Sequence, residues 1–365
     1  AQAWGDLADV LAFAVFTFES GMDDYRAKAK SAIDRAVELA PDDTDVIRSL
    51  GTYYYYASRD YVQATEQYEK LARRQPNDPT VFNSLGLIQR RQGNWAQALL
   101  NQRRASELDP ANIKYLRNLL ATEQAGNHYD QVAALQRRIS TLLPGNIAEG
   151  YFLAQISFLA RGSTVETDAY FAHLSLEEAN SPAGLNWRRD WAALRGDYAE
   201  AIRLDRLQPY YDGTVFTREE QAMLSAQWYF AVGDHAGMVA RLGDATAVWR
   251  RQLELEPKNA RTWIVLGLAE ALLGNKAEAV RCAEHGKQLN PESQDALDGI
   301  GYASIAAAAY DWTGDKEKAL AEYARLLRKP YGMNVHTLEH SVSTLHGDAR
   351  FEALVKDPAN NAPQF

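Results

Sequence analysis

The sequence predicts an all-α protein, a solenoid of stacked antiparallel helix pairs, and two regular features of the 365-residue chain predict it. Prolines recur every 34 residues at Pro76, Pro110 and Pro144, and again at Pro257 and Pro291. Proline cannot continue a helix and pushes the preceding residue out of the α region, so each marks a helix end. The second feature is Gly followed by Asn or Asp, which recurs between the prolines in RQGNWAQAL, QAGNHYDQV, LLGNKAEAV and WTGDKEKAL.

These turns define the repeating unit. Glycine readily takes the left-handed position that ends one helix, and Asn or Asp caps the next helix. The unit is therefore a helix, a tight turn, a second helix and a turn that contains proline. A pair of helices this short cannot bury its apolar face alone, so neighbouring pairs must stack into a superhelix. Sustained strand alternation occurs nowhere along the sequence.

Composition excludes several classes of protein. Apolar residues make up 46% of the chain, which argues against disorder. The net charge of −9 argues against a dedicated nucleic-acid surface or anionic-membrane surface. The single cysteine, Cys282, excludes intramolecular disulfides. The most apolar run, Val10 to Phe18, has about half the length of a spanning helix, so we expect a buried helix there and no membrane insertion.

The residues around the prolines resemble the tetratricopeptide repeat (TPR) family. One matching run begins at Trp263 and continues with Leu266, Gly267, Ala279 and Pro291. A second run comprises Phe82, Leu85, Gly86, Ala98, Ala105 and Pro110. The resemblance implies a right-handed superhelical, TPR-like solenoid of about eight units, ending in a C-terminal capping helix. The small residues are expected where helices approach closely, and the large ones between helices.

The match divides the chain into two parts. Residues 1–330 are expected to form the TPR-like α-solenoid, regular at 42–145 and 258–330 and irregular at 146–257. Within the irregular part we expect an inserted loop around Gln208 to Thr217. Thr217 and Glu220 form a capping box that opens the next helix. Residues 331–365 are expected to form a C-terminal cap and tail.

The cap carries a second resemblance. Asp348, Arg350 and Phe351 are similar to an Asp-Pro-Arg-Phe motif that closes TPR regions attached to bacterial winged-helix regulators, cyclases and serine/threonine kinases, with Ala349 in place of the proline. We expect Phe351, Leu354 and Val355 to cover the last repeat. The resemblance implies a bacterial signalling or regulatory protein. The compartment stays open between cytoplasm and periplasm, and a further domain upstream of Ala1 is expected.

Binding residues are predicted on the first helix of each pair, which lines the concave groove in solenoids of this class. We expect this groove to be basic and the exterior acidic. Of the four tyrosines from Tyr53 to Tyr56, two should pack in the helix pair and two should reach the groove or solvent. The predicted partner-binding groove consists of Arg48, Thr52, Tyr55, Asn83, Leu87, Arg90, Lys114, Arg117 and Asn118. Arginine and asparagine suit peptide carboxylates and amides, and tyrosine adds rigid apolar area.

The sequence therefore favours a non-enzymatic interaction module or scaffold that binds a protein or peptide partner. Nucleophile, phosphate-loop and dinucleotide motifs are absent from the sequence, and we expect no catalytic residue, cofactor or metal. The alternative is a ligand-sensing domain with a small-molecule pocket in the irregular region, suggested by Trp187, Arg188, Arg189, Trp191, Tyr210, Tyr211, Trp228 and Tyr229. A third reading, a zinc hydrolase, depends on the sequence HTLEH from His336 to His340, for which surface or capping histidines are the simpler interpretation.

Overall fold

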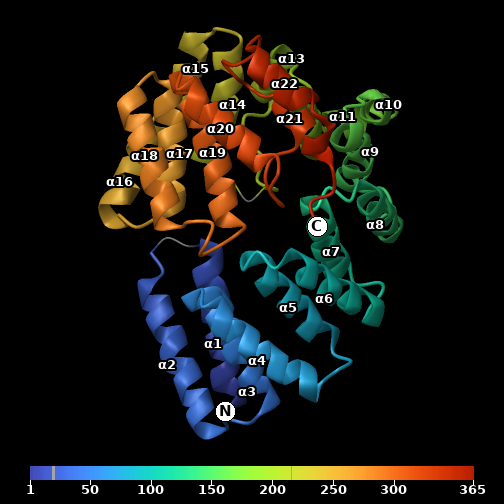
Figure 1. Ribbon diagram of the computed structural model, residues 1–365, viewed down its shortest axis with the longest axis vertical. Coiled ribbons are helices and arrows are strands. Elements are labelled where there is room, and N and C mark those ends of the chain that lie inside the picture. The colour runs from blue at the N-terminus through green and yellow to red at the C-terminus, as the bar shows by residue number, and fades with distance from the viewer. Residues whose placement is uncertain (19–20, 215) are drawn as a thin grey trace. The chain divides into compact units, whose positions relative to one another are not determined.

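The computed structural model describes residues 1–18, 21–214 and 216–365, and every regular element in these ranges is helical (Figure 1). The helices belong to two compact units. Unit 1 comprises residues 1–122 together with residues 292–297, and unit 2 comprises residues 123–291 and 298–365. The division falls within α7 (Ile113–Ala125). The predicted all-α class is confirmed.

Unit 1 contains three pairs of consecutive helices that pack against each other. We name the first helix of each pair helix A and the second helix B. The pairs are α1 (Gln2–Phe18) with α2 (Asp23–Leu39), α3 (Thr44–Tyr53) with α4 (Tyr61–Arg74), and α5 (Pro79–Arg91) with α6 (Trp95–Leu108). A π-helix, η1 (Tyr54–Ser58), continues α3.

Unit 2 contains five further packed pairs. They are α9 (Ile147–Arg161) with α10 (Val165–Ala172), α12 (Pro182–Leu194) with α13 (Tyr198–Leu207), α14 (Arg218–Ala231) with α15 (His235–Leu242), α17 (Ala260–Leu272) with α18 (Lys276–Leu289), and α19 (Asp298–Thr313) with α20 (Lys316–Leu326). Additional helices are α8 (Tyr129–Leu142), α11 (Leu176–Asn180), α16 (Ala245–Leu255), α21 (Val335–Glu339), α22 (Ala349–Lys356) and the 3₁₀ helix η2 (Pro358–Asn361).

The Gly-Asn and Gly-Asp turns between consecutive helices follow the predicted chemistry except at the turn between α7 and α8. Gly93 and Gly274 have φ angles of +76° and +79°, in the left-handed region that glycine adopts without steric cost. In the sequence Gly126-Asn127, however, it is Asn127 that takes the left-handed conformation, with φ +58°. Asparagine tolerates this region because its short side chain bonds locally. Gly126 must therefore be explained by its surroundings rather than by its backbone angle.

Close helix approach explains a glycine of the repeat motif. A Cβ on Gly267 of α17 would lie 2.9 Å from the Ala283 backbone nitrogen and 3.0 Å from the Ala279 carbonyl oxygen of α18. The predicted packing role of these small residues is confirmed. The predicted capping box is also present, because the Thr217 hydroxyl accepts from Glu220 N–H and the Glu220 side chain accepts from Thr217 N–H.

The first helix differs from the prediction of a buried helix. α1 packs on α2 and α3 through Ala8, Ala12 and Val15, which are at most 3% exposed. Val10 and Phe13 are 68% and 55% exposed, although the Phe13 ring meets the Tyr56 ring of η1. Within the described residues, none of the helices combines the length and apolar content that a membrane span requires.

Residues 292–297 complete unit 1 although they are distant in sequence from its other helices. Asp295, 1% exposed, accepts from Arg91 Nη1 at 2.5 Å and from the Tyr61 hydroxyl at 2.6 Å. The Ala296 N–H donates to the Arg91 carbonyl at 2.7 Å. Arg91 also lies over the Phe16 ring, with its guanidinium carbon 5.2 Å from the ring centroid. A buried ion pair with aromatic neighbours thus fastens this segment to the ends of α5 and α4.

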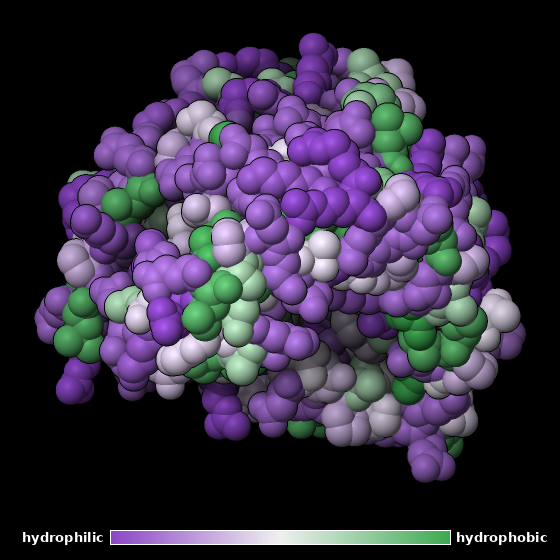
Figure 2. Space-filling view, turned by 90° about the horizontal axis from the view of Figure 1, so that it is seen from below, coloured by the Kyte–Doolittle hydropathy of each residue, from purple (hydrophilic) through white to green (hydrophobic). Residues whose placement is uncertain are grey.

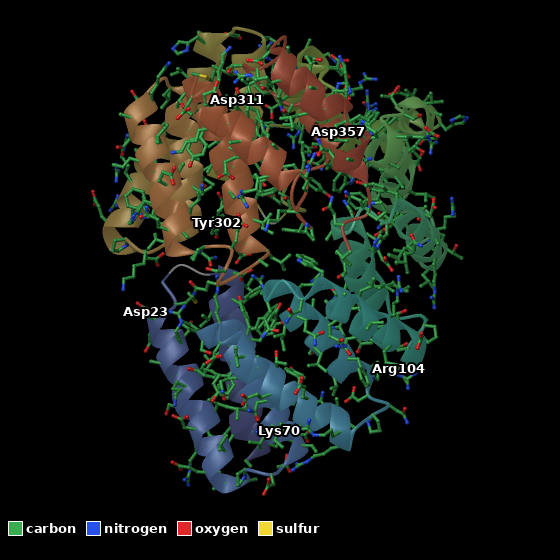
Figure 3. All side chains as sticks on the ribbon, viewed as in Figure 1. Asp23, Lys70, Arg104, Tyr302, Asp311 and Asp357 are labelled. Carbon is green, nitrogen blue, oxygen red and sulfur yellow. The ribbon has the colours of Figure 1, made fainter. Side chains whose placement is uncertain are left out.

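The chain after α20 packs across the A helices of unit 2. α21 contacts α9, where the ring of Phe158 lies 5.6 Å from that of His340. Further along, Trp312 Nε1 of α19 donates to the Val342 carbonyl at 2.8 Å. The neighbouring Asp311, labelled in Figure 3, accepts four hydrogen bonds from residues of α20 and the cap. Residues 331–346 therefore form part of the unit 2 core.

The capping helix itself lies where the sequence predicts. In α22 Phe351 and Val355 are 0% and 6% exposed, and Leu354 packs against the same core cluster. The Asp348 carboxylate caps the helix by accepting from Arg350 N–H. What the sequence does not predict is how much of the A-helix surface the preceding residues cover.

Candidate functional site

The candidate site is the A-helix side of unit 1, where α1 and α3 meet. The Asp9 carboxylate of α1 accepts from the Ser49 hydroxyl of α3 at 3.0 Å. One helical turn further along α1, the Phe13 ring meets the edge of Tyr56 at 5.7 Å, and Phe16 packs on Tyr56 at 4.9 Å. We call Asp9, Phe13, Phe16, Arg48, Thr52 and Tyr56 the α1–α3 surface.

Two buried polar atoms on the α1–α3 surface have no partner within the described part of the chain. They are Asp9 Oδ1, an acceptor, and Arg48 Nη1, a donor. The other oxygen of Asp9 bonds Ser49, and Arg48 Nη2 bonds Gln75 and Asp78 at 2.8 and 2.9 Å. Buried polar atoms without a hydrogen bond are rare in folded proteins, and each requires an explanation such as a bound water or ligand.

The two carboxyl groups near Arg48, those of Asp9 and Asp78, have pKa values shifted in opposite directions. Burial, with a smaller contribution from the charge of Asp6, raises the pKa of Asp9 to about 6, against the opposing hydrogen bonds from Ser49 and Thr52 and the charge of Arg48. Burial also acts to raise the pKa of Asp78, but the Thr80 N–H and Arg48 outweigh it and the pKa is lowered. Asp78 is therefore the firm ionic partner of Arg48, whereas the Asp9 carboxylate is incompletely satisfied when it is ionised.

Asp9 gives a prediction on stability. Between pH 4 and pH 6 the folded state binds more protons than the unfolded state, so stability falls as the pH rises through this window. Asp9→Asn removes this loss while keeping an acceptor for Ser49. We expect the variant to be more stable than the wild type by about 1–3 kcal/mol at pH 7.5 and equal to it at pH 4. Urea unfolding at the two pH values measures the difference. The exposed Glu66→Gln on α4 is the control, and a gain independent of pH would contradict the assignment.

The predicted groove residues of α3 are only partly available to a partner. Arg48 lies on the α1–α3 surface, and the Thr52 hydroxyl is 3.1 Å from the Tyr68 hydroxyl. Tyr55 is buried, at 8% exposure, among Phe16, Tyr61 and Arg91. In its place, Tyr56 points toward Phe13.

The physical reason for this exchange is the π-helix. A π-helix bonds residue i to residue i+5, so it holds more residues per turn than an α-helix and rotates the side chains that follow. Tyr53 and Tyr55 are buried, as expected for two of the four tyrosines, while Tyr54 and Tyr56 are half-buried and their access to a groove stays a prediction. Because of the π-helix, Tyr56 rather than Tyr55 lies at the position that the sequence predicted for Tyr55.

The predicted residues of α5 and α7 fall into two groups. Asn83 is 2% exposed and accepts from Asn118 Nδ2 at 2.8 Å, so the two amides bond each other. Leu87 packs against the cluster formed by Ile47, Leu85 and their neighbours. Arg90 is half-buried, while Lys114 and Arg117 are exposed. Asp9, Phe13 and Phe16 were missed, because the longer α1–α2 hairpin interrupts the period from which groove positions were extrapolated.

The expected separation of charge between groove and exterior is wrong for unit 1. The B helices α4 and α6 carry exposed basic side chains at Lys70, Arg73, Arg74, Arg103 and Arg104. Several of them pair with acidic groups, as Arg74 does with Asp42 at 3.6 Å. Figure 2 shows one face of the molecule, which is mainly hydrophilic with separate apolar patches.

The aromatic and Arg-rich region of unit 2 is packed internally. Trp187 stacks on Tyr151 at 5.4 Å, and Trp191 Nε1 donates to Asp168 at 2.8 Å. Asp205, 1% exposed, accepts from both Arg189 and Arg241. These contacts fasten α12, α13 and α15 together and engage three of the side chains that suggested a ligand pocket, Trp187, Arg189 and Trp191.

The HTLEH sequence spans α21 and the residue after it. Burial lowers the pKa of His336, and its ring and that of His340 lie 6.3 and 5.6 Å from the Phe158 ring. The His340 carbonyl accepts from the Tyr198 hydroxyl at 2.5 Å. The described residues contain no group of three or more His, Cys, Asp or Glu side chains placed to hold a metal ion. Both histidines have packing roles between α21 and α9.

Comparison with known proteins supports the fold. No protein-family model and no curated protein matches the sequence. Among solved structures, yeast Tom70 has a TM-score of 0.52 and 16% identity over 79% of this chain. The chain spans only 59% of the Tom70 chain. A tetratricopeptide repeat protein from Parabacteroides merdae has a TM-score of 0.46 and 16% identity, covering 76% of this chain and 98% of the other. The chain has the TPR fold that the 34-residue spacing indicates.

Proposed function

We propose that the protein is a non-enzymatic interaction module that binds a partner peptide or domain through the A helices of unit 1. The observation that carries the proposal is the 55% exposed ring of Phe13 on the same surface as Asp9 Oδ1 and Arg48 Nη1, two buried polar atoms with no hydrogen-bond partner among the described residues. The same surface therefore combines unused hydrogen-bonding capacity with exposed apolar area, the two components of a binding hot spot.

The chemistry of the surface suits an extended peptide. A peptide group offers one N–H donor and one C=O acceptor, which complement the carboxylate oxygen of Asp9 and the guanidinium of Arg48. An apolar side chain next to that group would pack on Phe13 and Tyr56. Hydrogen bonds to ionised groups contribute more than neutral ones, about 1.5–3 kcal/mol each, so the pair can fix the register of the peptide.

The non-enzymatic part of the proposal is supported by the state of the potential nucleophile. Cys282 is 0% exposed, and burial together with the nearby Glu278 raises the pKa of its thiol to about 12. The thiolate is the reactive form, so this cysteine is inert near neutral pH.

We also propose that the chain belongs to a bacterial signalling or regulatory protein. This rests on the Asp348-Ala349-Arg350-Phe351 segment and its likeness to closing motifs of such proteins. Each matching residue has a structural role at this point: Asp348 caps α22, Arg350 pairs with Glu317 at 2.6 Å, and Phe351 is buried.

Peptides selected from a random display library against the full chain test the binding proposal. We expect Phe13→Ala and Arg48→Gln to weaken a selected peptide at least tenfold in fluorescence anisotropy. Phe13 is mostly exposed, so its replacement leaves the fold intact. Lys70→Gln on the outer helix α4 is the matched control and should leave the affinity unchanged.

Two results would contradict the proposal. One is a set of selected peptides whose affinity is reduced by Lys70→Gln but not by Phe13→Ala. The other is crosslinking of bound peptides only to B helices. Either outcome would move the binding site away from the α1–α3 surface.

A further inference from the structure

The last residues of the chain, Asn361 to Phe365, lie in unit 2 against the end of α7, the start of α8 and the end of α9. The Phe365 ring meets the edge of the His128 ring at 5.2 Å, and the Phe365 carbonyl is 3.0 Å from His128 Nε2. The other nitrogen of this ring lies 2.7 Å from the Glu123 carboxylate. His128 is thereby held in one orientation and presents Nε2 to the terminal segment.

Backbone and amide groups continue the contact. Gln364 N–H donates to the Gly126 carbonyl at 3.1 Å, and Asn127 Nδ2 donates to the Ala362 carbonyl at 3.2 Å. One backbone hydrogen bond and one hydrogen bond from a side-chain amide therefore join the segment to the α7–α8 turn.

The side-chain amide of Asn361 anchors the other end of the segment. Asn361 Nδ2 donates to the Leu159 and Ala160 carbonyls at 3.3 and 2.9 Å. These carbonyls lie in the last turn of α9, where carbonyls have no partner within the helix. The Tyr129 hydroxyl lies 3.3 Å from Asn361 Oδ1. The NH₂ group and the carbonyl oxygen of the Asn361 side chain therefore both have hydrogen-bond partners.

Gly126 is explained by this contact. A Cβ at this position would lie 2.8 Å from the Phe365 ring and 2.9 Å from the His128 ring. Its backbone does not need glycine, since the left-handed residue of the turn is Asn127. The missing side chain leaves the space that the aromatic ring fills.

The terminal segment is separable from the core behind it. Asn360 is 0% exposed and donates to the Leu354 carbonyl at 2.9 Å, so the chain is fixed up to that residue. From Asn361 onward no residue is buried, and Ala362 and Pro363 are exposed. Residues 361–365 can leave their site without opening the hydrophobic cluster of unit 2.

We propose that the surface formed by Gly126, Asn127, His128, Tyr129 and the end of α9 is a peptide-binding site, and that residues 361–365 are its resident ligand. The partner it fits is a segment with a side-chain amide followed four residues later by an aromatic ring. Such a segment binds by replacing the chain's own residues, which therefore inhibit its binding. The site is separate from the α1–α3 surface and does not depend on it.

The test uses the full chain with Asn361→Ala and Phe365→Ala, which weaken the resident segment but keep its length. The probe is a fluorescein-labelled peptide of residues 359–365, amidated at its end. In fluorescence anisotropy we expect saturable binding to the double variant and binding at least tenfold weaker to the wild type, because the resident segment competes at high effective concentration. A peptide with alanine in place of the final phenylalanine should bind at least tenfold more weakly to the double variant.

Gly126→Ala, added to the double variant, is designed to obstruct the site. It adds one methyl group where the peptide ring must lie, and we expect at least a tenfold loss of peptide affinity with an unchanged circular dichroism spectrum. Phe13→Ala should have no effect on this peptide, which distinguishes the site from that of the proposed function. The proposal is overturned if the folded double variant does not bind the peptide, if it binds no tighter than the wild type, or if Gly126→Ala has no effect.

Discussion

Asp295→Ala is expected to destabilise unit 1 by about 3–5 kcal/mol, the usual cost of removing one partner from a buried ion pair. The variant removes the acceptor of Arg91 Nη1 and of the Tyr61 hydroxyl. The Arg91 side chain is only 9% exposed, so its charge cannot regain water without moving. Its remaining neighbours include the Tyr55 hydroxyl, at 3.4 Å, and the Phe16 ring. These aromatic contacts place the expected effect at the lower end of the range.

Urea unfolding combined with hydrogen exchange measures this effect. Protection should fall in α4 and α5, which carry Tyr61 and Arg91, and in residues 292–297. The exposed Glu66→Ala on α4 should change stability by less than about 0.5 kcal/mol. The double variant Arg91→Met with Asp295→Leu should recover most of the lost stability, since apolar residues of similar volume often replace a buried pair without cost. An Asp295→Ala protein with unchanged stability would show that the pair is dispensable.

This ion pair also shows where reasoning from the sequence ends. The spacing of Pro76, Pro110 and Pro144 and the Gly-Asn turns predict the helix pairs, because helix ends depend on local chemistry. Arg91 and Asp295 are 204 residues apart, and neither lies in a motif that marks the contact. A repeat period relates each unit only to its neighbours. A contact that crosses many repeats is therefore invisible to it.

In the candidate site, too, the sequence predicts features that depend on the regular repeat and misses those that depend on a local departure from it. Arg48 and Thr52 precede the π-helix, so the rotation that it introduces does not affect them, and their role in a groove stays a prediction. The prediction failed at Tyr55, because the rotation introduced by η1 cannot be read from four consecutive tyrosines. It assigned Gly126 to a left-handed turn, whereas Asn127 has that conformation and Gly126 accommodates the ring of Phe365. One glycine in a turn motif can thus serve either backbone geometry or close packing, and only the structure distinguishes the two.

Asp311→Ala is expected to have a similarly large effect in unit 2. Asp311 is 0% exposed and accepts from the Tyr323 hydroxyl at 3.0 Å and the Ser343 hydroxyl at 2.5 Å. It also accepts from Thr344 N–H at 2.9 Å and the Thr344 hydroxyl at 2.7 Å. Each buried donor left without a partner costs about 1–3 kcal/mol. We expect a total loss of about 3–5 kcal/mol, because the buried Tyr323 hydroxyl loses its acceptor in the interior and the groups of Ser343 and Thr344 lose theirs nearer the surface.

The effect should be local before it is global. Hydrogen exchange is expected to increase first in residues 335–346, which Asp311 fastens to α19, while α2 of unit 1 keeps its protection. Asp311→Asn keeps the shape but presents an amide donor to donors, so its cost should be intermediate. Ser343→Ala removes one bonded group together with its own hydroxyl and should cost about 1 kcal/mol. Equal loss of protection in both units would instead mean that Asp311 stabilises the chain as a whole. A graded series confined to the cap would establish that one buried carboxylate holds residues 331–346 over the A helices.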